Sequence, residues 1–473
     1  MHYIEQISIN GEFVTPHGTE RFDLYNPATA RVTGQVRLAD EVDAERAIAA
    51  AKAAFPAWAR TTKQERIAAL RRMQAAVAAR HDDLLEAVIE EYGAPASRSA
   101  WMASYPTEVI AQAITALETF EFIAVAGAAR VEMTPLGVAG LITPWNSDAG
   151  FICGKLAAAL AAGCTAVIKP SEMSALQTQI VTETLHAADL PPGVFNIVTG
   201  RGDRVGETIS RHPDVAKISF TGSTQTGKAI LRNAAENFTR VTLELGGKSP
   251  TLILDDADLD QAVSLAVQAG LMNSGQACVA GTRILVPQSR QAEMEQALAR
   301  AIAAVKSGDP RDSTTEVGPM VSEKQWQRVQ GYIRRGQEEG ARLLAGGEGR
   351  PEGTRDGWFV RPTLFTDVHN QMAIARDEIF GPVLCVIPYR DEEEAIAIAI
   401  ANDTDYGLSA LVLGGDAERA RRVAQQIQSG RVLVNTLAHE PQAPFGGFKH
   451  SGVGREMGAW GIRAFMEPKS LLG

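Results

Sequence analysis

Cys278 is the cysteine whose surroundings favour chemistry. The other three, Cys153, Cys164 and Cys385, lie in apolar or helical runs, where we expect them to be small buried core residues. Cys278 follows the sequence Asn-Ser-Gly-Gln-Ala (273–277), whose small and polar residues are typical of a loop that admits a ligand close to its backbone. A nucleophilic thiol needs partial exposure and stabilisation of its thiolate. Cys278 is therefore the candidate nucleophile.

Glu244 stands at the end of an apolar strand candidate (240–245), directly before two glycines. Strand ends in doubly wound sheets are where ligands bind. Burial there would raise the pKa of the carboxyl and suit it to general-base work. An ion pair with Lys248 explains the same carboxylate equally well, so both interpretations stay open.

Asn146 ends the sequence Leu-Ile-Thr-Pro-Trp-Asn (141–146), at a strand-to-helix junction. Its side-chain amide could donate a hydrogen bond to a developing oxyanion. The alternative is that Asn146 caps the following helix, a position that asparagine also favours.

Three segments could bind a dinucleotide. Gly222 and Ser223 lie between a strand and a helix, where backbone amides could hold a pyrophosphate. The run 200–206 (GRGDRVG) has one residue more than GxGxxG and is weak evidence by itself. Lys169 and Glu172 directly follow a strand candidate and could hold a ribose diol.

The bulk properties exclude several classes of protein. The chain has 473 residues and a formal net charge of −10, so no basic stripe is available for a nucleic acid. The spacing of cysteines and histidines fits neither a disulfide framework nor a CxxC or HExxH metal site, so we expect no metal. No signal peptide and no apolar run of ~18 residues is evident. We expect a cytoplasmic enzyme without a membrane or nucleic-acid partner.

The elements that must position these residues alternate between strands and helices. Residues 41–90 have helical periodicity, and short apolar runs alternate with amphipathic stretches from 137 onward. The first series has strand candidates at 137–142, 165–168, 194–198, 215–220 and 240–245, and helix candidates at 150–162, 175–188, 203–210 and 224–236. The second has strands at 250–254, 283–286, 384–388, 409–413 and 431–434, and helices at 258–272, 289–306, 323–340 and 416–428. We read 395–401 as part of a helix opened by 391–394. This rhythm predicts two doubly wound, parallel α/β domains.

Taken together, these motifs resemble the aldehyde dehydrogenase superfamily over nearly the whole chain. They occur in the order PWN (144–146), KPSE (169–172), LPPGVFNIVTG (190–200), FTGST (220–224), LELGGKSP (243–250), NSGQAC (273–278), EIFGPV (378–383) and PFGGFKHSGVGRE (444–456). Each motif is modestly specific, and the full ordered set is very specific. The resemblance implies two Rossmann-like α/β domains plus a small β oligomerisation arm.

The resemblance also implies a mechanism. The thiolate of Cys278 attacks an aldehyde, and Asn146 with the Cys278 backbone N–H stabilises the oxyanion. A thioester remains after hydride transfer to a nicotinamide, and Glu244 activates the water that hydrolyses it. Lys155, on the helix after PWN, helps to orient groups or relay protons.

By the same residue-by-residue correspondence, the cofactor site is expected at Ile142, Trp145, Lys169, Glu172, Gly202, Gly206, Phe220, Gly222, Ser223 and Leu245, with Glu378 and Phe380 at the nicotinamide end. Glu172 favours NAD, because a carboxylate bonds the ribose 2′-OH and repels a 2′-phosphate. Lys169 would tolerate that phosphate, so NADP is the alternative cofactor.

The substrate channel is expected to be lined by Phe151, Gly154, Ala277, Val279, His439 and Phe445. Relatives often carry a bulky aromatic residue at the position of Gly154, so the glycine leaves room for aromatic or longer aldehydes. Many relatives also follow PWN with an aromatic residue and a proline, where this chain has Ser147 and Asp148. An inward-facing Asp148 would disfavour anionic substrates, and an outward orientation is equally compatible with the sequence. His439 is the one basic residue assigned to the channel.

The resemblance divides the chain into an NAD-binding domain (1–118 and 138–246), a catalytic domain (247–436), an oligomerisation arm (119–137 and 457–473) and a segment with the substrate-channel loop (437–456). The segment between the helix at 105–125 and Pro135 is short for the family, so part of the arm is expected to be missing. A homodimer or homotetramer is still expected.

Three rival functions are weaker. A CoA-acylating semialdehyde dehydrogenase shares the cysteine but generally lacks the water-activating glutamate, which is present as Glu244. A non-phosphorylating glyceraldehyde-3-phosphate dehydrogenase needs basic channel residues, of which only His439 is expected. A catalytically silent structural protein would not need Asn146, Glu244 and Cys278 together.

Overall fold

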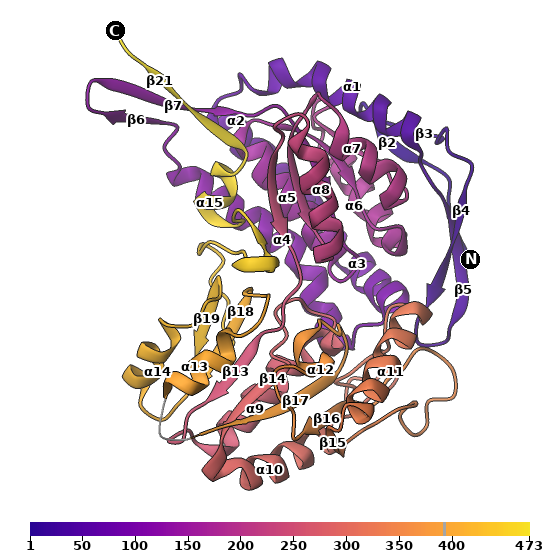
Figure 1. The fold of residues 1–473 in the computed structure, drawn as a ribbon. Helices are drawn as coiled ribbons and strands as arrows, with labels where there is room; N and C mark the ends of the chain where they lie inside the picture. The colour runs from indigo at the N-terminus through magenta and orange to yellow at the C-terminus, as the bar shows by residue number, and fades with distance from the viewer. Residues whose placement is uncertain (391–393) are drawn as a thin grey trace.

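The computed structural model describes residues 1–390 and 394–473. In this part of the chain, the strands form two large and two small sheets. Figure 1 shows two lobes, one drawn mainly from indigo to magenta and the other from orange to yellow. The prediction of two α/β domains, each with a sheet of mainly parallel strands, is confirmed.

The first large sheet has the order β20-β12-β11-β8-β9-β10-β2-β3. Its members are β2 (Ile7–Ile9), β3 (Glu12–Val14), β8 (Val138–Ile142), β9 (Thr165–Lys169), β10 (Phe195–Ile197), β11 (Val215–Thr221), β12 (Arg240–Glu244) and β20 (Gly452–Val453). The strands from β8 to β12 are parallel. β8 and β9 are buried along their whole length, which matches their continuous apolar sequences. The chain runs outward from β8 through β9 to β10 and separately from β11 to β12, so the topological switch point lies between β8 and β11, where ligands of such sheets bind.

Helices cover both faces of this sheet. They are α1 (Glu41–Trp58), α2 (Lys63–Ala78), α3 (His81–Ala87), η1 (Val88–Tyr92), α4 (Ala96–Thr119), α5 (Asp148–Ala162), η2 (Glu172–Ser174), α6 (Ala175–Ala187), η3 (Gly202–Gly206), α7 (Glu207–Arg211) and α8 (Thr224–Ala235). Capping boxes at Asp40 and Thr62 begin α1 and α2. One core cluster joins α2, α4 and α5 to the sheet, and another joins α1, α7 and α8 to it.

The second large sheet has the order β15-β16-β17-β14-β13-β18-β19. Its strands are β13 (Pro250–Ile253), β14 (Arg283–Pro287), β15 (Arg342–Ala345), β16 (Thr363–Thr366), β17 (Val383–Tyr389), β18 (Ser409–Leu413) and β19 (Arg431–Val434). The surrounding helices are α9 (Leu259–Leu271), η4 (Met272–Gly275), η5 (Gln288–Arg290), α10 (Gln291–Ala304), α11 (Glu323–Glu338), α12 (Ala373–Arg376), α13 (Glu394–Asn402) and α14 (Ala417–Ala424). Because β12 leads directly into β13, the carboxyl edge of the first sheet meets the amino edge of the second.

Several elements differ from the sequence-based expectation. The helix expected at 203–210 is split into η3 and α7, and the one expected at 105–125 is α4, which begins earlier and ends at Thr119. Neither β15 nor β16 was predicted, and β15 is only partly buried, so its hydrophobic pattern is weak. The helix expected at 395–401 is present as α13, while residues 391–393 of its expected start lie outside the described residues.

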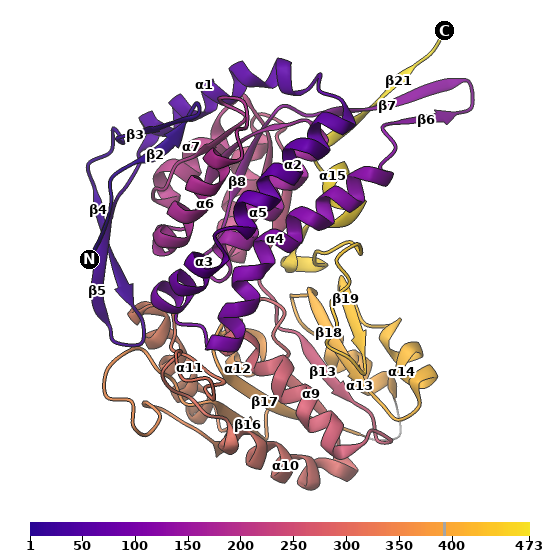
Figure 2. The same ribbon diagram turned by 180° about the vertical axis from the view of Figure 1, so that it is seen from behind.

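A small sheet of order β21-β7-β6 projects from the first lobe (Figures 1 and 2). It contains β6 (Ile123–Ala126), β7 (Ala129–Pro135) and β21 (Met466–Leu471). The side chains of β6 are exposed, and Val125 is 80% exposed. The structure therefore places a three-stranded arm at the segments expected to form one, despite the short connection.

The other small sheet has the order β1-β5-β4, with β1 (His2–Ile4), β4 (Arg21–Asn26) and β5 (Arg31–Arg37) on the flank of the molecule (Figure 2). Near the C-terminus, η6 (Lys449–Ser451) and α15 (Gly458–Arg463) return the chain to the first lobe. Among the helices of the described residues, none is both long and apolar enough to cross a membrane.

Candidate active site

The loop that carries Cys278 is fixed by buried amides. It leaves η4 through Asn273 and Ser274, both with positive φ, and reaches the half-buried Cys278 after Gln276. The side chain of Gln276 donates to the Tyr92 hydroxyl (3.3 Å) and accepts from the backbone N–H of Val321 (3.0 Å). These contacts anchor the loop, and Cys278 is the one cysteine of the described residues that is not fully buried. The other three cysteines are buried and free, so their assignment to the core is confirmed.

Asn146 is attached to the same loop. Its Nδ2 donates to the Gln276 carbonyl oxygen at 3.1 Å, and Asn273 Nδ2 donates to the Asn146 carbonyl oxygen at 3.2 Å. The alternative that Asn146 caps α5 is wrong, because Ser147 occupies the N-cap position. The amide of Asn146, which follows β8, is therefore bonded to a residue two positions before Cys278.

Glu244 is the last residue of β12 and is only 3% exposed. Neither of its carboxylate oxygens has a hydrogen-bond partner, and the Nζ of Lys248 has none either, so the alternative ion pair is absent. Burial raises the pKa of Glu244 well above its usual range, and the neighbouring Glu456 raises it further. A buried carboxyl with free oxygens and a raised pKa has the properties of a general base.

Gly446 allows the chain to pass beside this carboxyl. Its φ is +150°, and a Cβ at this position would lie 2.7 Å from Glu244 Oε1. Glycine is thus required both by the backbone conformation and by the space.

Lys155 belongs to a network beside Glu244. Its Nζ donates to Glu456 Oε1 (2.5 Å) and to Ser219 Oγ (2.9 Å), and Ser219 Oγ donates to the same Glu456 oxygen (2.7 Å). The sequence-based analysis missed Glu456 and Ser219. Glu456 lies in the final motif of the resemblance, which was the one available signal, whereas Ser219 resembles any other small residue of a buried strand.

The turn after Glu244 brings the nucleophile and Glu378 together. The backbone N–H of Gly247 donates to Glu378 Oε1 at 3.0 Å, and a Cβ on Gly247 would lie 2.3 Å from the Cys278 carbonyl oxygen. Burial raises the pKa of Glu378 to about 7, although this N–H lowers it. Burial also raises the pKa of the Cys278 thiol to about 12, assisted by Glu378 and Glu244 and opposed by Arg431.

The expected cofactor residues of the first sheet lie in one row. In the strand registers, Ile142 is opposite Lys169 on one side and Phe220 on the other, and Thr221 is opposite Glu244. All of these residues stand at the carboxyl ends of their strands, and Leu245 follows directly. The Trp145 ring lies edge-on to Phe380 with centroids 5.4 Å apart.

The phosphate-binding candidates differ in how tightly they are packed. Ser223 caps α8, its Oγ accepting from the Thr226 N–H, and Gly222 precedes it. A Cβ on Gly202 would meet no atom within 4 Å, and one on Gly206 would meet only Lys169 Cδ at 3.9 Å. Gly202 and Gly206 are therefore open to solvent or loosely packed, whereas a Cβ on Gly222 would lie 2.4 Å from the Phe220 ring.

Lys169 and Glu172, the pair expected to hold a ribose, form an ion pair of 3.4 Å. Arg201, which was not anticipated, also pairs with Glu172 at 3.3 Å. The carboxylate at the expected ribose position is thus held between two cations.

The expected channel residues come from several elements. Ala277 and Val279 flank Cys278 and are half-buried, Phe151 lies on α5, and His439 is exposed on the loop. Gly154 faces α4, where a Cβ would lie 3.6 Å from Val109.

Arg431 is a basic residue that the analysis of the sequence missed. Its guanidinium lies 5.9 Å from the centroid of the Phe445 ring, and its charge acts on Cys278 and His439. The expectation that His439 is the one basic group near the channel is therefore wrong. Arg431 begins β19, and only the packing of that strand reveals its place.

Asp148 faces neither the channel nor solvent. It is fully buried, and its two oxygens accept hydrogen bonds from the hydroxyls of Thr143 (2.9 Å) and Thr178 (2.8 Å). Burial raises the pKa of its carboxyl to about 7. Both orientations considered from the sequence are wrong, because Asp148 ties the start of α5 to α6.

This geometry sets the strand ends at the switch point of one sheet beside a cysteine loop at the edge of the next, the arrangement expected of a dinucleotide-dependent enzyme with a cysteine nucleophile. Groups of three or more potential metal-ligating side chains do not occur within the described ranges.

Comparisons with known proteins agree with the family expected from the sequence. The model of the aldehyde dehydrogenase family matches residues 13–471. The 3-succinoylsemialdehyde-pyridine dehydrogenase of a Pseudomonas species is 44% identical over 100% of this chain and 99% of its own length. Crystal structures include aldehyde dehydrogenase C of Pseudomonas syringae with NAD+ and octanal (42% identity, TM-score 0.97, covering 99% of this chain and 96% of that one). The Mycobacterium tuberculosis aldehyde dehydrogenase with NAD+ has 39% identity and a TM-score of 0.96, covering 99% and 98%.

The chain belongs to the aldehyde dehydrogenase family. It is an oxidoreductase that acts on aldehydes with NAD, so the family, fold class, enzyme class and cofactor expected from the sequence are confirmed.

Proposed function

We propose that the protein oxidises an aldehyde to a carboxylic acid through a thioester on Cys278, which water activated by Glu244 hydrolyses. The observation that carries this proposal is the convergence of both groups on one turn. Glu244 ends β12, and three residues later Gly247 packs against the backbone of Cys278. Glu244 is a buried carboxyl without hydrogen-bond partners among the described residues, and it lies beside the cysteine loop. Such a group can act as the general base that removes a proton from an attacking water molecule.

The residues of the first sheet suit a dinucleotide. The glycines of η3 border open space, Ser223 caps a helix whose N-terminus faces the switch point, and the strand ends in between are aligned. When bound, NAD accepts the hydride that leaves the substrate carbon. Glu172 would bond the ribose 2′-OH, which favours NAD. Lys169 and Arg201 would tolerate a 2′-phosphate, so NADP is the weaker alternative.

The first chemical stage depends on Cys278 and Asn146. The thiolate attacks the aldehyde carbon, and the carbonyl oxygen becomes an oxyanion. Asn146 Nδ2 donates one hydrogen bond to Gln276, and its second N–H can donate to this oxyanion together with the backbone N–H of Cys278. Because the amide is already fixed by the loop, it needs no reorientation during the reaction.

The second stage depends on Glu244. With its pKa raised by burial, the carboxylate is a stronger base than an exposed one and can remove a proton from the attacking water. The network of Lys155, Ser219 and Glu456 lies next to it and offers a route for that proton. Glu378 and Phe380 would contact the nicotinamide ribose and ring from the opposite side of the turn.

Hydrolysis is preferred to transfer of the acyl group to CoA, because Glu244 is present and has no partner that would neutralise it. The other channel residues, Phe151, Gly154, Ala277, Val279, His439 and Phe445, would select the aldehyde. The structurally similar Pseudomonas syringae enzyme holds octanal, which makes a medium-length alkanal a suitable first substrate.

We also propose that the protein acts in the cytoplasm as a homodimer or homotetramer. The exposed apolar strand β6 of the projecting arm supports self-association, because an unpaired edge of this kind favours pairing with another chain.

NADH formation from NAD and a panel of aliphatic, aromatic and charged aldehydes tests the proposal, with NADP run in parallel. We expect turnover with NAD and at least one group of aldehydes. Folded protein that binds NAD but produces no NADH from any of them would contradict the proposed function.

A further inference from the structure

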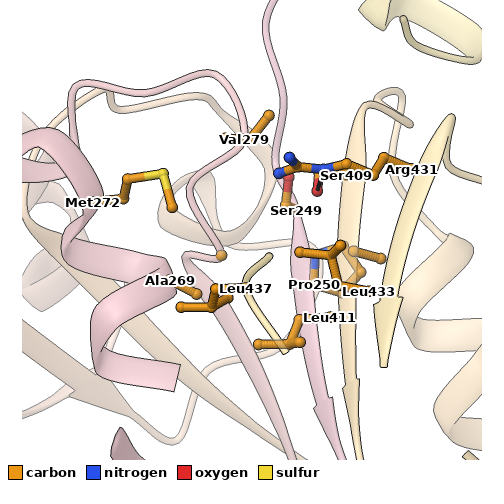
Figure 3. Close-up of a pocket in the computed structure, with 12 residues that line it drawn as sticks. Ser249, Pro250, Ala269, Met272, Val279, Ser409, Leu411, Arg431, Leu433 and Leu437 are labelled. Carbon is orange, nitrogen blue, oxygen red and sulfur yellow. Dashed lines mark hydrogen bonds between the residues drawn. The ribbon is translucent and has the colours of Figure 1, made fainter. Parts of the chain in front are cut away.

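Arg431 lines a small, partly open cavity at the amino ends of β13, β18 and β19 (Figure 3). The space in it that a water-sized group can enter is about 10 Å³, and its whole empty volume, which includes the part open to solvent, is about 290 Å³. Val279, which follows the nucleophile, and Leu437 of the channel loop also line it. The cavity therefore adjoins the site where the aldehyde must react.

Few polar groups line this cavity, and they make few hydrogen bonds with one another. Figure 3 shows the guanidinium of Arg431 directed toward Ser249 and Ser409. Within the described residues, its guanidinium donates one hydrogen bond, from Nε to Ser409 Oγ at 3.2 Å. The Ser249 side chain is buried, with the residue only 3% exposed, and its Oγ has no hydrogen-bond partner. Within the part of the chain that the structure describes, no carboxylate lies within ion-pair distance of Arg431.

Arg431 is half-buried, and a cation partly removed from water without a counter-ion is costly, as is the buried Ser249 hydroxyl without a partner. Burial lowers the pKa of Arg431, which reflects this cost. Arg283 shows how a buried guanidinium is usually stabilised. It donates hydrogen bonds to the backbone oxygens of Lys248, Ile400 and Ala401. Arg431 has no comparable set of acceptors, so its free donors are available to a ligand.

We propose that Arg431, Ser249 and Ser409 form a subsite that binds the carboxylate of an aldehyde substrate. The substrate class is an unbranched aldehyde with a carboxylate at its far end. A guanidinium donates paired hydrogen bonds in a geometry that matches a carboxylate, and the serine hydroxyl supplies a further donor. Phe445 and Val279 would cover the methylene chain between the two ends. This inference rests on the proposed function, because it assigns the selectivity of the same site.

The rival explanation is that Arg431 acts on the nucleophile, since its positive charge lowers the pKa of the Cys278 thiol. The two roles differ in what they predict for neutral substrates. Stabilising the thiolate would assist every aldehyde equally, whereas the carboxylate subsite assists only the acids.

The test measures kcat/KM for NADH formation with 4-oxobutanoate, 5-oxopentanoate and 6-oxohexanoate, each beside the alkanal of equal chain length. In the wild type, we expect the acid to exceed its alkanal at one chain length or more. Arg431→Met should lower that acid-to-alkanal ratio by about 10- to 100-fold, as expected for the loss of a charge-assisted pair. Arg431→Lys should retain part of the ratio, because it keeps the charge but loses the paired donors.

Ser249→Ala provides a second variant, which removes a buried hydroxyl that makes no hydrogen bond in the folded protein. It should lower the ratio by about 3- to 10-fold. Arg422→Met, at an exposed position of α14, is the matched control and should leave the ratio unchanged.

A wild type that prefers the alkanal at every chain length would overturn the subsite, as would an Arg431→Met variant that slows acids and alkanals equally. Absence of NADH with all acids and all alkanals would instead contradict the proposed function itself.

Discussion

The side-chain amide of Asn146 is hydrogen-bonded to the backbone carbonyl of Gln276 at 3.1 Å. This bond joins the end of β8 in the first sheet to the loop that carries Cys278 in the second. The cofactor side and the nucleophile side of the site are therefore positioned relative to each other by the same residue that is proposed to stabilise the oxyanion.

Asn146→Ala should lower kcat by about 10²- to 10³-fold, because it removes a preorganised donor from the oxyanion. Steady-state NADH formation with octanal measures the effect. Asn237→Ala is the control, since Asn237 also donates to a backbone carbonyl, that of Arg211 at 2.8 Å, but on an exposed loop. Equal rates for Asn146→Ala and the wild type would remove Asn146 from the mechanism.

Cys278→Ala should abolish turnover and leave NAD binding intact, because most of the expected cofactor residues lie on the other sheet and none of them is Cys278. Quenching of tryptophan fluorescence by NAD can follow the binding. Cys153→Ala, in the core of α5, should retain activity at moderate temperature and lose only stability. Normal turnover by Cys278→Ala would exclude the covalent mechanism.

Gly446→Ala should slow hydrolysis of the thioester by about 10-fold or more. The added Cβ would displace the Glu244 carboxyl, 2.7 Å away, and the positive φ would be strained. Pre-steady-state kinetics should show an initial burst of NADH followed by a slow steady rate. Gly331→Ala in α11 is the matched control, because its Cβ would meet no atom within 4 Å. That variant should keep full activity and gain about 0.5–1 kcal/mol in free energy of unfolding. If Gly446→Ala has the same steady-state rate as the wild type, residue 446 does not need to be glycine for Glu244 to act.

The buried Asp148 should make stability depend on pH. Its pKa is about 7 in the folded protein, above its ordinary value of 3.8, so the folded state holds a proton that the unfolded chain has lost between these values. The free energy of unfolding should therefore fall as pH rises from about 4 to about 7. Glu91, with a pKa raised by burial to about 8, acts in the same direction.

Asp148→Asn should make this decline shallower, and urea unfolding at a series of pH values measures it. Asp260→Asn, at an exposed position, should leave the slope unchanged. If the slopes of wild type and Asp148→Asn coincide, the Asp148 carboxyl is not protonated in the folded state.

The sequence was sufficient for the parts of the molecule that depend on local pattern. Apolar runs located the parallel strands, and the motifs around Asn146, Glu244 and Cys278 indicated residues that the fold does bring to one place. Ordered motifs are informative here because each stands at a strand end or turn whose position the sheet determines.

The remaining features depend on packing between distant segments. Arg431 and Ser249 are 182 positions apart and meet only because β13 and β19 flank β18. The orientation of Asp148 was predicted wrongly, because nothing near it in the sequence shows that the hydroxyl of Thr178, on α6, donates a hydrogen bond to its carboxylate. The short strand β15 was missed because its partly buried residues alternate weakly.

The most direct test of the central claim is to trap the thioester. Glu244→Gln, mixed with NAD and octanal, should release one NADH per active site and then stall, and mass spectrometry should find an octanoyl group on the peptide that contains Cys278. Full steady-state turnover by this variant, or an NADH burst without acylated Cys278, would contradict the assignment of Glu244 as the base and Cys278 as the nucleophile.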